Sequence, residues 1–281
     1  MATEPVAGEM DEDIETVEAP ERPDGARRVW SWLWPKLAAL ALFIAAWQLV
    51  VWSGWRPDYL LPGPLPVFQR LGEDLSQPTF YAGVAVTLRR ALVGYAIAIA
   101  IGSVVGVLVA RTPIVRKAVG HAILGLQSMP SIAWLPLAIL LFQQSEGAVL
   151  VVVVLGAAPA VATGLLSGVD HVQPLLVRAG RVMGARGLQL YRYVILPAAL
   201  PGYVGGLKQG WAFAWRSLMA AEIINIIASQ PSIGQQLQFA HDFADAQQLL
   251  ALMIVIFLIG VTVDLGFGFA DRAIRRRRGL A

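Results

Sequence analysis

Long apolar stretches recur along the chain and predict helices that cross a membrane. Such a helix needs about 20 consecutive apolar residues. Five stretches of about that length run with no charge or with a single acid: 37–55, 91–110, 118–145, 147–169 and 246–270. A sixth stretch, 200–228, is largely apolar but carries Lys208, Arg216 and Glu222. We therefore predict six membrane spans, five apolar and one polar.

The segment between the first two spans has a different pattern. Residues 54–88 contain Pro57, Pro62, Pro64 and Pro66. Proline breaks helices because it lacks a backbone N–H and its ring clashes with the preceding turn. We expect an extended stretch here, followed by a short surface helix around 67–74.

Composition supports the membrane interpretation. The 281 residues are 57% apolar and 15% charged, with a mean hydropathy of +0.61. A soluble domain normally carries about 25% charged residues. A chain of this size with six such stretches has too little polar surface to cover them in water. We predict an all-α, polytopic membrane protein with six transmembrane helices.

The charges are unevenly distributed along the chain. Residues 1–25 contain nine acids and one base, with almost no large apolar side chains. A segment of that composition cannot offset the entropy of ordering. We expect four parts, namely a disordered acidic tail, the first span with the proline-rich outer segment, a transmembrane domain and a basic tail: 1–29, 30–81, 82–271 and 272–281.

The basic residues predict the orientation. They concentrate before the first span, in the second and fourth loops, and at the end of the chain. The positive-inside rule places both termini and the 170–200 loop in the cytoplasm, although Arg89 and Arg90 lie at the outer end of the second span. We attribute the basic excess to orientation, so no nucleic-acid partner is expected. The arginine run 275–278 suits anionic membrane lipids.

Residues typical of catalysis or metal binding are missing from the pattern. The chain has no cysteine, and His121, His171 and His241 lie far apart without metal-ligand spacing. No Gly-x-Ser-x-Gly, His-Glu-x-x-His or phosphate-binding P-loop motif occurs. We expect no catalytic residue, no metal site and no cofactor in this chain, so any ATP chemistry must come from another chain.

The loop 170–197 is the most informative part of the sequence. Pro174 suits the first position of a helix, and Gly184 can end that helix in a left-handed conformation. A second short helix from Leu188 should end near Leu196, because Pro197 disfavours helix in the residue before it. Two amphipathic helices joined at a glycine could present an apolar ridge to a soluble partner. They could equally rest on the lipid headgroups.

This loop resembles the permeases of ATP-binding cassette (ABC) importers. Those permeases carry Glu-Ala-Ala, three residues, Gly, nine residues and Ile-x-Leu-Pro at this place. The matching positions in this chain are Arg178-Ala179-Gly180, Gly184 and Val194-Ile195-Leu196-Pro197. The glutamate and one alanine are replaced. The segments 60–67, 131–137 and 197–201 also resemble one branch of these permeases, which serves sulfonate, taurine, nitrate and related solutes.

The resemblance implies a type I ABC importer permease fold and a pore-forming role in the inner membrane. It further implies a second permease copy, two cytoplasmic ATPase subunits that bind the ATP, and an external substrate-binding protein. Residues 174–197 would be the coupling helices, with Arg178, Ala179, Gly180, Gly184, Val194, Leu196 and Pro197 at the motif positions. The solute would be a small anion, moved by alternating access.

Polar residues within the spans are candidates for the substrate path, because charge in a membrane is costly and usually paired or functional. Arg216 could bind an anion with two hydrogen bonds, and pairing of charged residues with other helices is the alternative. The path candidates are Gln127, Ser128, Ser131, Arg216 and Glu222. The serines and Gln127 could equally hydrogen-bond between helices.

Gly102 and Gly106 form a small-residue pattern that lets helices approach closely. It serves packing inside one subunit or a homodimer interface.

Two other functions compete with the importer permease. A secondary transporter not coupled to ATP usually shows inverted repeats, and the two halves of this chain are not similar. A membrane-embedded enzyme would want a nucleophile beside a base, and none is evident.

Overall fold

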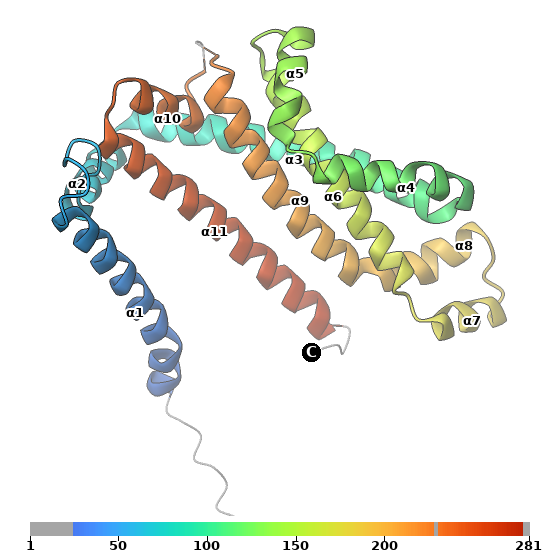
Figure 1. Ribbon diagram of the computed structural model, residues 1–281. Coiled ribbons are helices and arrows are strands. Elements are labelled where there is room, and N and C mark those ends of the chain that lie inside the picture. Colours follow the sequence, from blue (N-terminus) through green and yellow to red (C-terminus); the bar gives the residue numbers. More distant parts are fainter. Residues whose placement is uncertain (1–24, 228–229, 278–281) are drawn as a thin grey trace, which may run out of the picture. The chain divides into compact units, whose positions relative to one another are not determined.

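The computed structural model describes residues 25–227 and 230–277 (Figure 1). Within these residues the chain forms helices and turns and no β-strand, which confirms the all-α prediction. Residues 1–24 of the expected acidic tail lie outside the described residues.

The chain divides into two compact units, one ending at Trp55 and one beginning at Arg56. The first contains a single helix, α1 (Gly25–Trp52), whose segment 33–52 is apolar enough to cross a membrane. The helix begins at Gly25, within the last residues of the segment expected to be disordered. The boundary lies inside the expected part 30–81.

The second unit begins with two helices that contact each other. The expected surface helix is α2 (Pro64–Leu75), and the second span is α3 (Pro78–Arg111). Both start with proline in the first turn, where its missing N–H has no intrahelical partner to lose. The span α3 extends well beyond the apolar stretch 91–110 and includes Arg89 and Arg90 as helical residues.

The predicted third span, 118–145, is not one continuous helix. It consists of α4 (Pro113–Ser128), a 3-10 turn (Ser131–Trp134) and α5 (Leu135–Phe142), and the two helices are bent by 101°. Met129 has an extended backbone, with ψ of 131°, because the ring of Pro130 disfavours helix in the residue before it. The predicted third span is thus broken into two helices at this proline.

Three helices form the core. The central helix, α6 (Glu146–Asp170), packs on α3 and on α9 (Leu196–Ile224). A Cβ added to Gly164 would lie 2.2 Å from the Cα of Gly206 in α9. A Cβ on Gly102 of α3 would lie 2.5 Å from the carbonyl oxygen of Ala158 in α6. These glycines therefore let backbones touch, and Gly102 serves packing inside the subunit.

The chain ends with a short and a long helix. The apolar span α11 (Ala246–Arg277) continues as helix into the expected basic tail, to Arg277. The short helix α10 (Ile233–Asp242) was not predicted. Its signal is present in the sequence: Ser232 caps the first turn by accepting a hydrogen bond from the Gln235 N–H at 3.3 Å, and Ser-x-x-Gln is a helix-start pattern.

Four helices of the described part are long and apolar enough to span a membrane, and the bent pair α4–α5, if it is counted as one broken span, makes a fifth. The remaining long helix, α9, is the predicted polar one. Between α6 and α9 lie α7 (Pro174–Val182), α8 (Leu188–Leu190) and a π-helical turn (Tyr191–Ile195). Figure 1 shows α7 and α8 projecting at the end where α6 leaves the core and α9 enters it.

Candidate functional site

The segment from α7 to the start of α9 forms a helical hairpin, here called the coupling hairpin (Pro174–Pro197). Gly184 has φ of +88°, a conformation that glycine adopts without a steric penalty. Its N–H bonds to the Arg181 carbonyl at 3.0 Å, and the Ala185 N–H bonds to the Gly180 carbonyl at 3.0 Å. This pair of bonds is the Schellman ending of a helix, so the predicted glycine stop is confirmed.

The two arms of the hairpin touch at Gly180. A Cβ on Gly180 would lie 2.9 Å from the Val194 side chain and 3.0 Å from that of Leu190. Because those distances are shorter than van der Waals contact, only glycine fits here with the arms as they are. Gly180 is buried, whereas Arg178 and Ala179 on the same helix are exposed.

Pro197 does not end the second arm, contrary to the expectation. The helix runs from α8 through the π-helical turn into α9, and Pro197 sits in the first turn of α9. A proline ring inside a helix clashes with the carbonyl four residues earlier, which is that of Tyr193. The wider π-helical turn at Tyr191–Ile195 lies at this carbonyl and makes room for the ring.

Apolar side chains cover the outside of the coupling hairpin. They lie on α7, at the glycine corner and on α8, and all are more than 60% exposed: Leu175, Val182, Met183 and Leu188. Large exposed apolar groups beside arginines do not suit hydrocarbon. This set is here called the apolar ridge. An exposed apolar patch of this kind marks a surface that contacts another protein or a membrane.

The path candidates Gln127 and Ser131 bond to neighbouring helices. The Thr163 hydroxyl of α6 donates to Gln127 Oε1 at 2.9 Å. The Ser217 hydroxyl of α9 donates to Ser131 Oγ at 2.7 Å. Ser128 is exposed and bonds only to the carbonyl of Gly125 in its own helix. Gln127 and Ser131 thus connect helices, and Ser128 faces away from the core.

Arg216 is exposed on α9. Its Nε donates to the carbonyl of Ala212 at 3.2 Å, and its guanidinium lies 5.1 Å from the centre of the Phe213 ring. No acidic side chain of the described residues pairs with it. By contrast, Lys208 on the same helix pairs with Asp264 of α11 at 3.1 Å.

Glu222 is buried in a network near the C-terminal end of α9. Its carboxylate accepts hydrogen bonds from Arg90 at 3.1 Å, from the Thr87 hydroxyl at 2.9 Å and from the Gly234 N–H at 3.2 Å. Glu222 is 0% exposed and Arg90 is 2% exposed. Glu222 therefore fits the structural alternative, since it joins α3, α9 and the start of α10.

Sequence reasoning missed Arg90 as the partner of Glu222. Arg90 is an exception to the charge pattern, and pairing with a buried acid is a reason for such an exception. Arg90 also lies 3.5 Å from Glu146 at the start of α6. Its exposed neighbour Arg89 contacts Glu146 and donates to Gln230 at 3.0 Å.

Several helices of the described chain are long and apolar enough to cross a membrane, and they pack closely through glycine. These features indicate an integral membrane protein. The family model of the binding-protein-dependent transport system inner membrane component matches residues 98–276. The chain belongs to this family, the permeases of ABC importers.

Known proteins of this kind resemble the chain over most of its length. The taurine transport system permease of Escherichia coli is 30% identical, covering 88% of this chain and 91% of that protein. A putative aliphatic sulfonates transport permease of Bacillus subtilis is 25% identical, covering 93% of each. A chain of the inward-facing MetNI methionine ABC transporter has a TM-score of 0.61 at 22% identity, covering 70% of this chain and 98% of that one.

These comparisons confirm the predicted resemblance to importer permeases and to their taurine and sulfonate branch. The likeness to the methionine transporter confirms the type I importer fold. Members of the family are inner-membrane components of transport systems, and the two relatives named above are described as transport permeases.

Proposed function

We propose that this chain forms half of the pore of an ATP-driven importer for a small anion. Separate cytoplasmic ATPase subunits dock on the coupling hairpin, an external binding protein delivers the solute, and a second copy of the chain completes the pore. ATP binds to the partner chains alone. The exposed apolar ridge is the observation that supports this most directly, because nothing in the described chain covers it.

The orientation is part of this proposal. Both termini and the coupling hairpin lie in the cytoplasm, and α2 and α10 lie on the outer face. The arginines of the hairpin support it, since Arg178, Arg181 and Arg186 are exposed and basic loops remain on the cytoplasmic side.

Val182→Asp is expected to reduce binding of the ATPase at least tenfold. Val182 is 89% exposed, so the substitution disturbs no packing in this chain but places a charge in the apolar contact with the partner. A loss of about 1.4 kcal/mol is already tenfold. The measurement is co-purification of the chain in detergent with a tagged candidate ATPase.

Ile114→Asp is the matched control. Ile114 is 79% exposed at the same end of the bundle but lies outside the coupling hairpin, and its substitution should leave co-purification unchanged. Equal binding by wild type and Val182→Asp would reject the ridge as docking surface. A stable wild-type chain that binds no candidate ATPase would favour transport without ATP.

Among the candidates for the substrate path, Arg216 is the residue that we expect to bind the anion. Eight residues before the end of α9, it lies about 12 Å from the outer end at 1.5 Å per residue. An exposed arginine without an acidic partner at that depth requires water or an anionic ligand. Taurine and aliphatic sulfonates, which name two relatives of this chain, carry the oxyanion that a guanidinium binds with two hydrogen bonds.

Arg216→Gln is expected to slow uptake of radiolabelled taurine or nitrate roughly 10- to 100-fold, the equivalent of one charged hydrogen bond. Arg216→Lys should retain an intermediate rate, since lysine keeps the positive charge but cannot form the two parallel hydrogen bonds of a guanidinium. ATPase co-purification should not change in either variant. Wild-type uptake by Arg216→Gln would remove this residue from the path.

A further inference from the structure

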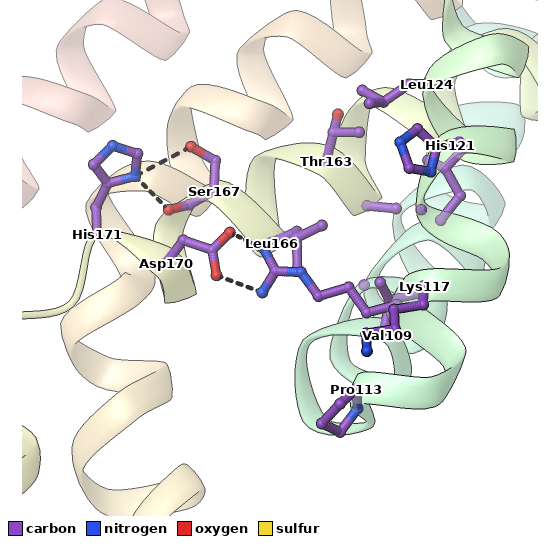
Figure 2. Close-up of a pocket in the computed structure, with 15 residues that line it drawn as sticks. Val109, Pro113, Lys117, His121, Leu124, Thr163, Leu166, Ser167, Asp170 and His171 are labelled. Carbon is purple, nitrogen blue, oxygen red and sulfur yellow. Dashed lines mark hydrogen bonds and ion pairs between the residues drawn. The ribbon is translucent and has the colours of Figure 1, made fainter.

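A cavity of about 670 Å³ opens between the C-terminal part of α3, α4 and the C-terminal part of α6. Figure 2 shows Lys117, His121 and Leu124 of α4 on one side, facing Thr163, Leu166, Ser167 and Asp170 of α6 on the other. None of the residues proposed for coupling or for the anion path lines it. The cavity is therefore a separate feature of the bundle.

The wall of the cavity is apolar. Val109 and Ile123 are buried there beside Ala162, and Leu124 and Leu166 extend the same wall. Gly120 lies in the wall, and a Cβ added to it would meet nothing within 4 Å. The missing side chain at Gly120 thus leaves open space on the cavity side of α4.

The rim of the cavity is basic. Arg116 and Asp170 neutralise each other through a two-pronged ion pair, one arm of which is 2.8 Å long. His171 bonds to the carbonyl of Ser167 at 2.7 Å. Lys117 is exposed and has no hydrogen bond or ion pair to any described residue. The rim therefore carries one uncompensated positive charge, with His121 and His171 beside it as hydrogen-bonding groups.

We propose that this cavity binds an acidic phospholipid of the cytoplasmic leaflet, with an acyl chain against the apolar wall and the phosphate at Lys117. The assignment to that leaflet rests on the orientation proposed above. A basic pocket between helices on the cytoplasmic side suits an anionic headgroup. A free oxyanion is a poor match for two reasons. The volume of the cavity is about twenty times the volume that one water molecule occupies in the liquid, about 30 Å³. The wall of the cavity also offers few hydrogen-bonding groups to a free anion.

The test compares lipid retained by the purified full-length chain in native mass spectrometry. The probes are palmitoyl-oleoyl phosphatidylglycerol, phosphatidylcholine with the same acyl chains, and inorganic phosphate. Gly120→Phe fills the open space and should reduce retained phosphatidylglycerol at least fivefold. Gly125→Phe is the control, since Gly125 lies on the same helix with open space at its Cβ but does not line the cavity.

The charge is tested separately. Lys117→Gln should weaken retention of phosphatidylglycerol at least threefold and leave retention of phosphatidylcholine unchanged. Arg111→Gln removes an exposed base that does not line the cavity and should have no effect. This pair remains informative where Gly120→Phe does not fold.

Several results would overturn the proposal. The first is equal retention of phosphatidylglycerol by Gly120→Phe and Gly125→Phe. The second is equal retention of phosphatidylglycerol and phosphatidylcholine by the wild type. The third is displacement of phosphatidylglycerol by inorganic phosphate, which would indicate a site for a free anion. Labelling of Lys117 by an impermeant amine reagent from outside the cell would contradict the assignment of the cavity to the cytoplasmic leaflet. None of these measurements involves the ATPase. Failure of the lipid proposal can therefore be distinguished from failure of ATPase docking.

Discussion

Gly164→Ala is expected to destabilise the folded permease by at least about 3 kcal/mol. Carbon atoms in contact lie about 3.5–4.0 Å apart, whereas the new methyl group would lie 2.2 Å from the Cα of Gly206. Overpacking that side chains can relieve already costs about 1–3 kcal/mol. Here the neighbour is the backbone of a long helix, which cannot move aside as a side chain can. The helices α6 and α9 would have to separate by more than 1 Å, roughly the difference between this distance and a normal carbon–carbon contact. The measurement is the melting temperature in detergent, with the yield of folded chain in the membrane.

Gly205→Ala is the matched control for this experiment. Gly205 lies next to Gly206 in α9, but a Cβ added to it would meet nothing within 4 Å. Alanine in an unstrained helix position is expected to leave stability unchanged or to raise it by about 0.4–1 kcal/mol. If both variants melt at the wild-type temperature, the close crossing of α6 and α9 is not what holds the core together.

Arg90→Met is expected to cost about 3–5 kcal/mol, because it leaves the carboxylate of Glu222 buried without its cation. Glu222 would keep the Thr87 hydroxyl and the Gly234 N–H as partners, but these are neutral donors. The corner where α3, α9 and α10 meet should therefore open first. Melting temperature and proteolysis of the segment between α9 and α10 measure this.

Two further variants separate the charge from the size of the side chain. Arg89→Met changes the adjacent residue, which is 55% exposed and pairs with Glu146, whose side chain is 36% exposed, so it should cost about 0–1 kcal/mol. The double variant Arg90→Met with Glu222→Gln removes both charges and should recover much of the lost stability. A double variant that is less stable than Arg90→Met alone would refute the isolated-charge explanation.

Apolar length predicted where the spans are, but not how they end or bend. The residues 78–90 of α3 are less apolar than the rest of that helix, and Thr87 and Arg90 hold this part in place through contacts with α9 and α10. Such contacts leave no trace in a count of apolar residues. The break at Pro130 was visible as a proline, yet the apolar pattern continues across it and made the two helices read as one.

The coupling hairpin was predictable to the extent that its features are local. The stop at Gly184 follows from glycine in a left-handed conformation after a helical pattern. The continuation through Pro197 depends on a π-helical turn, for which the sequence has no recognised signature. The pair Arg90–Glu222 joins residues 132 positions apart, and a single sequence does not indicate which of several distant charges will meet.

The continuity of α8 with α9 fixes the length of the segment that joins the motif glycine to the membrane helix. Each residue added to a helix turns everything before it by about 100°. One extra residue between Leu188 and Pro197 would therefore rotate the glycine corner by more than a quarter of a circle about the axis of α9. The apolar ridge would then point in a different direction, away from the proposed ATPase, while every residue in it stayed the same. This phase relation gives a physical reason for a constant number of residues between Gly184 and Val194-Ile195-Leu196-Pro197, independent of which side chains occupy the positions between them.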